Sequence, residues 1–169
     1  MGKAQREAGG FSIRPAGPAD VGLVLRFIRE LAAYEKLEDQ VVADEATLSQ
    51  QMFQKGRARA VIAEYEGEPV GFALYFFNFS TFLGRGGLYL EDLYLTPAVR
   101  GKGFGQRMFC YLAQVALQEG CGRMEWWCLD WNTPSQGFYR RMGAQPMEDW
   151  TVWRMTRQAL EALAEEGTV

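Results

Sequence analysis

The fold is decided by the stretch Leu88-Tyr89-Leu90-Glu91-Asp92-Leu93-Tyr94-Leu95-Thr96-Pro97-Ala98-Val99-Arg100-Gly101-Lys102-Gly103-Phe104-Gly105-Gln106. Its opening part is mostly apolar and β-prone, which predicts a buried strand over residues 88–95. Pro and Gly then punctuate a loop over 96–105, and a helix is expected from Gln106. Main-chain N–H groups of such a loop, together with those of the first helical turn, form a cradle for an anion. Arg100 and Lys102 add positive charge, so the segment predicts a pyrophosphate-binding site.

Two common nucleotide-binding motifs do not fit this loop. A P-loop ends in Gly-Lys-Ser/Thr, whereas Gly105 is followed by Gln106 and Arg107. A dinucleotide-binding fold needs G-x-G-x-x-G, and Gln106 occupies the place of the third glycine. A nicotinamide-dependent oxidoreductase is therefore disfavoured. The residues alone leave open a flexible glycine loop without a ligand, and the interspersed Arg100 and Lys102 argue against that alternative.

The rest of the chain predicts a single domain of the mixed α/β (α+β) class. Helical spacing and glycine or proline punctuation predict helices over residues 17–35, 44–54, 106–118 and 133–143, and from 156 onward. Further strands are expected over residues 11–14, 58–65, 69–79, 123–129 and 151–155, with a Gly-rich loop over 78–87. This order gives one mixed central sheet flanked by helices and antiparallel at its start. The domain is expected to cover residues 11–166, after a disordered leader over 1–10.

Composition and charge narrow the function classes. The chain has 169 residues and a net charge of -3, which argues against nucleic acid as a partner, because phosphate binding needs clustered Lys and Arg. There is no histidine, so the commonest zinc ligand and general base are missing, and no metal site is expected. Cys110, Cys121 and Cys128 are expected to be reduced thiols packed as small apolar groups. The longest apolar run is far short of the ~20 residues that cross a bilayer, and the start lacks a signal peptide, so a cytoplasmic protein without a membrane partner is expected.

The loop resembles a known motif, and its surroundings strengthen the likeness. Arg100-Gly101-Lys102-Gly103-Phe104-Gly105 is similar to the (Arg/Gln)-x-x-Gly-x-(Gly/Ala) motif of the GCN5-related N-acetyltransferase (GNAT) superfamily, which binds the pyrophosphate of acetyl-CoA. The chain from about Ser12 to Leu163 resembles the diamine acetyltransferase branch, which holds spermidine/spermine acetyltransferase and a thialysine-acetylating relative. The segments that carry this likeness are Glu30-Leu31-Ala32-Ala33-Tyr34-Glu35-Lys36-Leu37, Tyr89-Leu90-Glu91-Asp92, Leu129-Asp130-Trp131-Asn132, Phe138-Tyr139 and Gly143-Ala144-Gln145.

The resemblance implies a role for each matching position. Tyr139 matches the tyrosine that protonates the departing thiolate, and Glu91 matches the carboxylate that acts as general base, directly or through water. Residues implied to hold acetyl-CoA are Leu93, Tyr94, Leu95, Arg100, Gly101, Lys102, Gly103, Phe104, Gly105, Gln106, Asn132, Thr133, Pro134, Ser135 and Tyr139. Residues implied to line the amine pocket are Tyr34, Glu35, Glu91, Asp92, Glu148 and Trp150. Relatives pair as homodimers, so a homodimer is expected.

Elementary chemistry agrees with these roles. Acetyl transfer needs a neutral amine, and a free alkyl ammonium has a pKa of about 10.4, so a group near the pocket must accept its proton. In a chain without histidine, Glu or Asp must do this, and a tyrosine hydroxyl can donate to the leaving thiolate. Read alone, however, Glu91 and Asp92 could be a solvated pair, and Phe138 and Tyr139 could be core residues. The five tryptophans are expected mostly to pack, with Trp150 as a candidate for holding an ammonium by cation–π attraction.

One departure from the polyamine-acetylating pattern bears on the acceptor. The loop that there carries an acidic residue and a tryptophan here offers Ser80 and Phe82, with Arg85 nearby. A short amine that also bears a carboxylate, such as thialysine or another lysine-like amino acid, is therefore favoured over a long polycation, while diamines and polyamines stay in the predicted class. Two alternatives remain open: acetylation of a protein lysine or N-terminus, and a non-catalytic acyl-CoA-binding sensor. Intact Glu91 and Tyr139 argue against the sensor.

Overall fold

A computed structural model describes residues 10–167 of the chain, which divide into two compact units, Met1–Trp127 and Cys128–Val169. All but the last residue of the predicted leader lies outside the described residues. Among residues 10–167, no helix combines the length and apolar character that crossing a bilayer requires.

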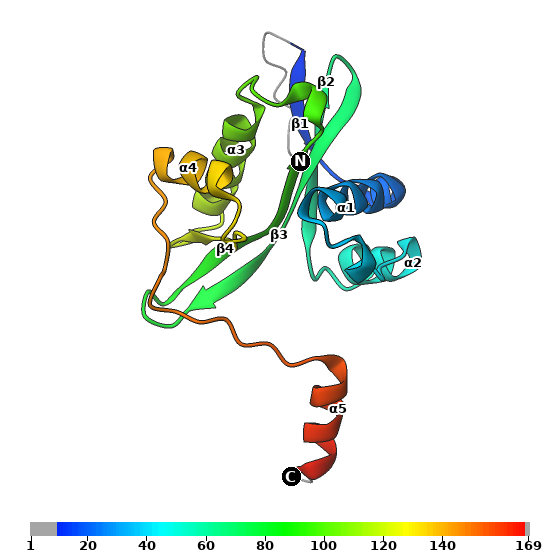
Figure 1. Cartoon of the computed structure of the whole chain (residues 1–169), viewed down its shortest axis with the longest axis vertical. Coiled ribbons are helices and arrows are strands. Elements are labelled where there is room, and N and C mark those ends of the chain that lie inside the picture. Colours follow the sequence, from blue (N-terminus) through cyan, green and yellow to red (C-terminus); the bar gives the residue numbers. More distant parts are fainter. Residues whose placement is uncertain (1–9, 168–169) are drawn as a thin grey trace. The chain divides into compact units, whose positions relative to one another are not determined.

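The first unit is built on one five-stranded sheet with the strand order β1-β2-β3-β4-β5 (Figure 1). The strands are β1 (Phe11–Pro15), β2 (Arg59–Tyr65), β3 (Glu68–Ser80), β4 (Arg85–Leu95) and β5 (Met124–Glu125). Neighbours from β1 to β4 are antiparallel, and β5 runs parallel to β4. The predicted mixed sheet is therefore confirmed, including its antiparallel start.

Two helices cover one face of this sheet. The first is α1 (Val21–Glu35), which follows a 3-10 turn (Pro18–Asp20). The second is α2 (Glu45–Leu48), which continues into a π-helical turn (Ser49–Gln54) (Figure 1). Another 3-10 turn (Glu38–Gln40) lies between the two helices. Asp44 caps α2 as predicted, accepting from the backbone N of Thr47 at 2.7 Å. The buried cluster on this face comprises Val24, Phe27, Met52, Ala60, Ile62, Phe72, Leu74 and Tyr94. Ala60 and Ile62 on β2, and Phe72 and Leu74 on β3, contribute to it from alternate positions, as the period of a strand requires.

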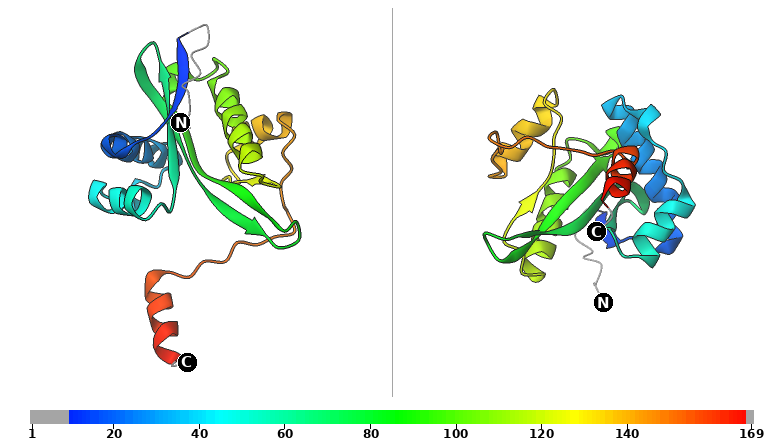
Figure 2. Two further views of the ribbon diagram at one scale, coloured as in Figure 1. Left: turned by 180° about the vertical axis from the view of Figure 1, so that it is seen from behind. Right: turned by 90° about the horizontal axis from the view of Figure 1, so that it is seen from below.

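The opposite face is covered by α3 (Phe104–Gln118), which follows a 3-10 turn (Pro97–Val99), and Figure 2 shows this helix from behind. Met108, Leu112 and Ala116 recur at helical spacing and are buried, as the sequence predicts. At the start of α3, Phe104 packs on Phe11, and near its middle Phe109 meets Trp126 edge to face.

The second unit contains α4 (Thr133–Arg141) and α5 (Arg157–Glu166). Asn132 caps α4 through its side-chain oxygen, which accepts from the backbone N of Ser135 at 3.4 Å. Thr156 caps α5 in the same way, accepting from the backbone N of Ala159 at 3.4 Å. Both helices begin where the sequence places a capping residue.

Four details of the predicted elements are wrong. Residues 78–87 are a hairpin rather than a loop, because β3 runs to Ser80, β4 begins at Arg85, and Gly84 supplies the positive φ of the turn. The strand expected over 123–129 is limited to Met124–Glu125, and the one expected over 151–155 is absent among the described residues. Both stretches are β-prone, but a strand persists only where a neighbour completes its hydrogen-bond ladder. Finally, α3 begins at Phe104, so two residues assigned to the loop are helical.

Candidate functional site

Glu91 is the extra residue of a β-bulge in β4. Asp92 pairs with Leu74 on β3, while the next residue of β3, Tyr75, pairs with Leu90. Two steps along β4 therefore match one step along β3, and Glu91 has no partner across the ladder. The bulge exposes Glu91 and turns Asp92 toward the face that carries α1, because its partner Leu74 belongs to the buried cluster on that face.

Three carboxylates gather at this bulge. Burial, then the nearby charge of Glu91, then that of Glu35 raise the pKa of Asp92 to about 7. Burial also raises the pKa of Glu35, which ends α1. A cation would relieve the repulsion among these groups, so the cluster is suited to attract an ammonium and to accept a proton near neutral pH. Glu35 is far in sequence from the adjacent Glu91 and Asp92, and the fold brings the three side chains close together.

Beyond this cluster, one edge of β4 has no strand beside it among the described residues. The parallel ladder with β5 consists only of Leu88 opposite Met124 and Tyr89 opposite Glu125. The main-chain groups of Leu93, Tyr94 and Leu95 that face away from β3 are therefore available to an extended ligand. These three residues are among those predicted to hold the coenzyme arm.

The glycine loop leads directly into α3. Gly101 and Gly103 have φ of 79° and 81°, which is the left-handed region that favours glycine. Gly103 is the N-cap of α3, so no side chain satisfies the first-turn N–H groups. A Cβ built on either glycine meets nothing within 4 Å, which leaves the space over the loop open. Open amides at a helix start are the donor set that a diphosphate requires, so these residues fit a coenzyme A thioester.

The two basic residues of this loop pack against aromatic rings. The guanidinium carbon of Arg100 lies 4.9 Å from the ring centroid of Tyr34 and 5.7 Å from that of Tyr94, and its Nε donates to the carbonyl oxygen of Leu95 at 3.1 Å. Lys102 Nζ lies 5.7 Å from the ring centroid of Tyr65. Arg100 therefore connects the predicted coenzyme loop with Tyr34, a predicted amine-pocket residue at the end of α1.

Within the second unit, the predicted residues fall in two places. Asn132, Thr133, Pro134 and Ser135 form the cap and first turn of α4, with Asn132 buried. Tyr139 lies two turns further along α4, half-buried, with its ring centroid 5.8 Å from that of Phe138. Glu148 and Trp150 lie in an exposed turn, closed by the backbone N of Trp150 donating to the carbonyl of Met147 at 3.2 Å. The roles assigned to these residues stay predictions.

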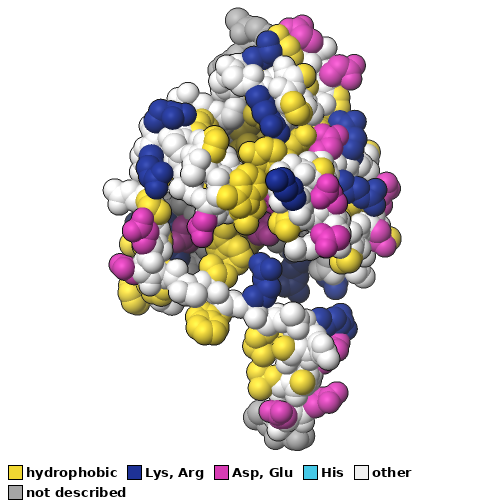
Figure 3. All heavy atoms as spheres, in the orientation of Figure 1, with side chains coloured by type: hydrophobic (Ala, Val, Ile, Leu, Met, Phe, Trp, Pro, Cys, Tyr) yellow, Lys and Arg dark blue, Asp and Glu magenta, His cyan; other side chains and the backbone are white. Residues whose placement is uncertain are grey.

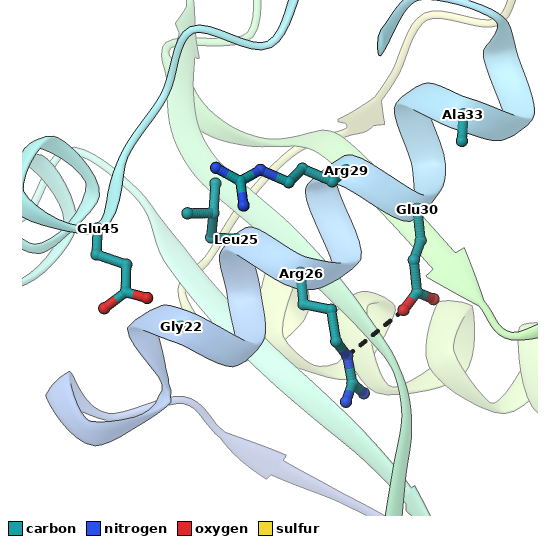
Figure 4. Close-up of a pocket in the computed structure, with 7 residues that line it drawn as sticks. All are labelled: Gly22, Leu25, Arg26, Arg29, Glu30, Ala33 and Glu45. Carbon is teal, nitrogen blue, oxygen red and sulfur yellow. Dashed lines mark ion pairs between the residues drawn. The ribbon is translucent and has the colours of Figure 1, made fainter.

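A hollow of about 340 Å³ on α1 is not the predicted site. Gly22, Leu25, Arg26, Arg29, Glu30, Ala33 and Glu45 line it (Figure 4). Arg26 and Glu30 pair across one helical turn at 3.4 Å, as the dashed line in Figure 4 marks. None of its lining residues belongs to the predicted coenzyme or amine set, and it is widely open to solvent.

Sequence reasoning missed a row of side chains across β3, β4 and β5. Phe76 stacks on Tyr89 with ring centroids 4.9 Å apart, and Tyr89 meets Trp127 edge to face at 6.0 Å. Burial, followed by the charges of Glu91 and Glu125, raises the pKa of Tyr89 to about 12. Trp127 is 57% exposed, and Trp153 is 90% exposed, so the expectation that these tryptophans pack is wrong. Likewise Cys110 is an exposed free thiol rather than a packed one.

The bulged strand, its open edge and the glycine-capped helix suit a transferase that uses an acyl-coenzyme A. Residues 26–144 match the Acetyltransferase (GNAT) family, and the chain belongs to that family. It is 40% identical to the thialysine N-epsilon-acetyltransferase of Bos taurus, over 90% of this chain and 96% of the relative. It is 29% identical to an L-ornithine N5-acetyltransferase of Arabidopsis thaliana, over 89% of this chain and 86% of the relative. An integron cassette protein of V. cholerae has a similar structure, with a TM-score of 0.76, 25% identity, and coverage of 92% of this chain and 98% of that one.

Proposed function

We propose that this N-acetyltransferase transfers the acetyl group of acetyl-CoA to the terminal primary amine of a small lysine-like amino acid such as thialysine. The observation that carries the proposal is the cluster of Glu35, Glu91 and Asp92 at the β4 bulge, beside an unpaired strand edge. Three carboxylates favour a cationic acceptor. The relatives named above act, by their names, on thialysine and L-ornithine, which supports an acceptor that is an α-amino acid with a side-chain amine.

On the coenzyme side, the open amides of Gly101–Gln106 are the proposed ligands of the diphosphate. The main chain of Leu93–Leu95 is the proposed partner of the coenzyme arm, and Asn132–Ser135 are proposed to line its other side. Acetyl-CoA, when bound, supplies the acetyl group as a thioester. The protein's own contribution is to hold the acceptor amine and to move its protons.

Two carboxylates are candidates for the proton acceptor. Glu91 is the proposed general base, directly or through water. Asp92 is the alternative, because a carboxyl group with a pKa of about 7 accepts a proton more readily than an ordinary aspartate does. Tyr139 is the proposed donor to the departing thiolate, since a phenol can give up its proton as negative charge develops on sulfur.

A panel of amines with a thiol-release assay tests the proposal. The purified protein and acetyl-CoA are offered thialysine, lysine, ornithine, spermidine and a lysine-containing peptide, and release of the coenzyme thiol is followed. We expect the highest kcat/KM with thialysine or another of the three amino acids. A higher kcat/KM for spermidine would reject the amino-acid acceptor. A higher kcat/KM for the peptide would favour protein acetylation, and thiol release that no amine stimulates would favour the acyl-CoA sensor.

The oligomeric state and compartment belong to the same proposal. We propose a homodimer, supported by apolar side chains that the second unit exposes. They include Trp150, Val152, Trp153, Met155, Leu160 and Leu163, and Figure 3 shows hydrophobic side chains gathered along α5. Light scattering during gel filtration tests this, and a monomeric mass at micromolar concentration would reject it. A cytoplasmic location is supported by the three free cysteines, which suit a reducing compartment, and cell fractionation tests it.

A further inference from the structure

The aromatic row defined by Phe76, Tyr89 and Trp127 lies on the same face of the sheet as Asp92. On β3, Phe76 is two residues beyond Leu74, whose side chain belongs to the buried cluster under α1. Phe76 is paired with Tyr89, and Leu74 is paired with Asp92. Because side chains two residues apart share a face, the row continues the surface that carries the carboxylate cluster. A ligand whose ammonium lies at Asp92 can therefore extend along this row.

A polar group stands at the far end of the row. Glu125 lies opposite Tyr89, and its Oε2 forms an ion pair with Arg123 Nε at 3.0 Å and accepts from Asn78 Nδ2 at 3.2 Å. Gly87 makes this arrangement possible, because a Cβ there would collide with Asn78 Oδ1. The contacts with Arg123 and Asn78 thus hold the Glu125 carboxylate in one position.

The side chains of Arg123 and Glu125 have further hydrogen-bonding atoms that a ligand could contact. The ion pair joins Nε of the guanidinium to Oε2 of the carboxylate. The terminal guanidinium nitrogens and Oε1 make no hydrogen bond within the described part of the chain. The two side chains are 39% and 36% exposed, so both can be reached from solvent. A guanidinium beside a carboxylate offers donors and an acceptor next to each other, which is complementary to an α-carboxylate beside an α-ammonium.

Charge and spacing favour an amino acid here over a second ammonium. A diamine would bring its far ammonium to Glu125 but also against Arg123, whereas a zwitterion meets both charges favourably. Tyr89 and Asp92 lie opposite Phe76 and Leu74, so the bulge brings them as close as two residues of β3, or about 7 Å at ~3.3 Å per residue. A lysine-like side chain spans about 6 Å from Cα to its terminal nitrogen, taking ~3.5 Å per three extended bonds. The length of the acceptor's stem therefore matches the separation between the two ends of the site.

We propose that Arg123 and Glu125 bind the α-carboxylate and α-ammonium of the acceptor, whose stem lies on Tyr89 and whose terminal amine lies at Glu91 and Asp92. This makes Arg123 the residue that distinguishes an α-amino acid from a simple diamine. The inference rests on the proposed function and names the part of the site that recognises the acceptor's far end.

The test uses three acceptors and two variants of the full chain. Lysine carries both α-groups, cadaverine lacks the carboxylate and 6-aminohexanoate lacks the α-ammonium. Arg123→Gln is expected to raise KM for lysine and 6-aminohexanoate by about tenfold or more, while KM for cadaverine stays the same or falls because a like charge is removed. Glu125→Gln is expected to raise KM for lysine about tenfold and to leave 6-aminohexanoate within about twofold. KM for acetyl-CoA stays unchanged in both variants.

A matched control comes from the other face of the sheet. Arg59 pairs with Glu119 at 3.2 Å at the end of α3, so Arg59→Gln removes a comparable exposed ion pair away from the site. It is expected to leave all three acceptors unchanged. The inference is overturned if Arg123→Gln affects lysine and cadaverine equally, or affects neither. If the wild type acetylates no amine at all, the proposed function fails by itself, and calorimetric titration of lysine into wild type and Arg123→Gln still decides whether Arg123 binds the amino acid.

Discussion

The ring of Phe104 stacks on the ring of Phe11, with centroids 4.1 Å apart and planes inclined by 21°. The ring of Tyr65 also lies against the ring of Phe104, with centroids 5.0 Å apart. Phe104 is the first residue of α3 and directly follows the N-cap Gly103. The stacking therefore fastens the start of the helix, and with it the open amides of the glycine loop, to β1 and β2.

Replacing Phe104 is expected to weaken both the fold and coenzyme binding. Phe104→Ala leaves a cavity beside Phe11 and should lower the free energy of unfolding by about 3 kcal/mol. Because the first turn of α3 then loses its attachment, KM for acetyl-CoA should rise severalfold, while Phe104→Leu should recover most of both properties. Urea unfolding and steady-state kinetics measure the two effects. A Phe104→Ala protein that is destabilised but keeps the wild-type KM for acetyl-CoA would show that the stacking of Phe104 does not position the glycine loop.

Gly103 is expected to tolerate no side chain without loss of coenzyme affinity. Its φ of 81° would cost an alanine about 1–2 kcal/mol, and a Cβ would enter the open space that the proposed diphosphate needs. Gly103→Ala should therefore raise KM for acetyl-CoA about tenfold or more. Gly67→Ala is the matched control, because Gly67 has a φ of 85° in the turn between β2 and β3, with nothing within 4 Å of its Cβ. Gly67→Ala should lose a similar amount of stability and keep the wild-type KM for acetyl-CoA. Equal effects of the two substitutions on this KM would reject the glycine loop as the diphosphate site.

The parts of the fold that follow from local patterns could be predicted from the sequence. The capping residues Asp44 and Thr156 mark true helix starts, and the stripe of Met108 and Leu112 marks the buried side of α3. Strand propensity failed where pairing decides, since residues 126–129 and 151–155 have no ladder partner. No local rule tells a β-prone stretch whether a neighbouring strand will be present.

The candidate site was predictable only where a motif carries it. Gly103 and its neighbours stand at the start of α3 as the motif requires. The bulge at Glu91 could not be foreseen, because it depends on the register between β3 and β4. The contact of Glu125 with Asn78 could not be foreseen either, since it depends on where β5 lies relative to β3 in the sheet.

Asp92 is expected to make acceptor binding depend on pH near neutrality. With a pKa of about 7, its carboxyl group ionises as the pH rises through that value, so affinity for an ammonium should increase over the same range. Asp92→Asn should flatten this rise in kcat/KM for the amine. Glu91→Gln removes a like charge, so in that variant the inflection should move to lower pH. A wild-type profile that is flat between about pH 6 and pH 8 would contradict the assignment.

The same group is expected to set a pH dependence of stability. The folded protein holds the Asp92 proton up to about pH 7, while the unfolded chain releases it near the ordinary aspartate pKa of 3.8. Stability is therefore lost as the pH rises from about 4 to about 7, because the folded state binds more protons across that window. At about pH 8, Asp92→Asn should melt at a higher temperature than the wild type, and its free energy of unfolding should be greater by about 1–3 kcal/mol at most. Both differences should vanish near pH 4. Thermal melts at both pH values measure them, and an Asp92→Asn protein less stable than wild type at the higher value would reject the raised pKa.

Tyr139→Phe is expected to lower kcat about a hundredfold, the usual effect of losing a positioned acid, while KM for acetyl-CoA changes little. The ring and its packing on Phe138 are retained in this variant, so only the hydroxyl is tested. Tyr111→Phe is the control, because Tyr111 is a half-buried tyrosine of α3 with no proposed role, and its loss should leave kcat unchanged. The rate of coenzyme thiol release measures kcat for the wild type and both variants. If Tyr139→Phe turns over like the wild type, the thiolate takes its proton from another donor or directly from water, and Tyr139 is then a packing residue of α4.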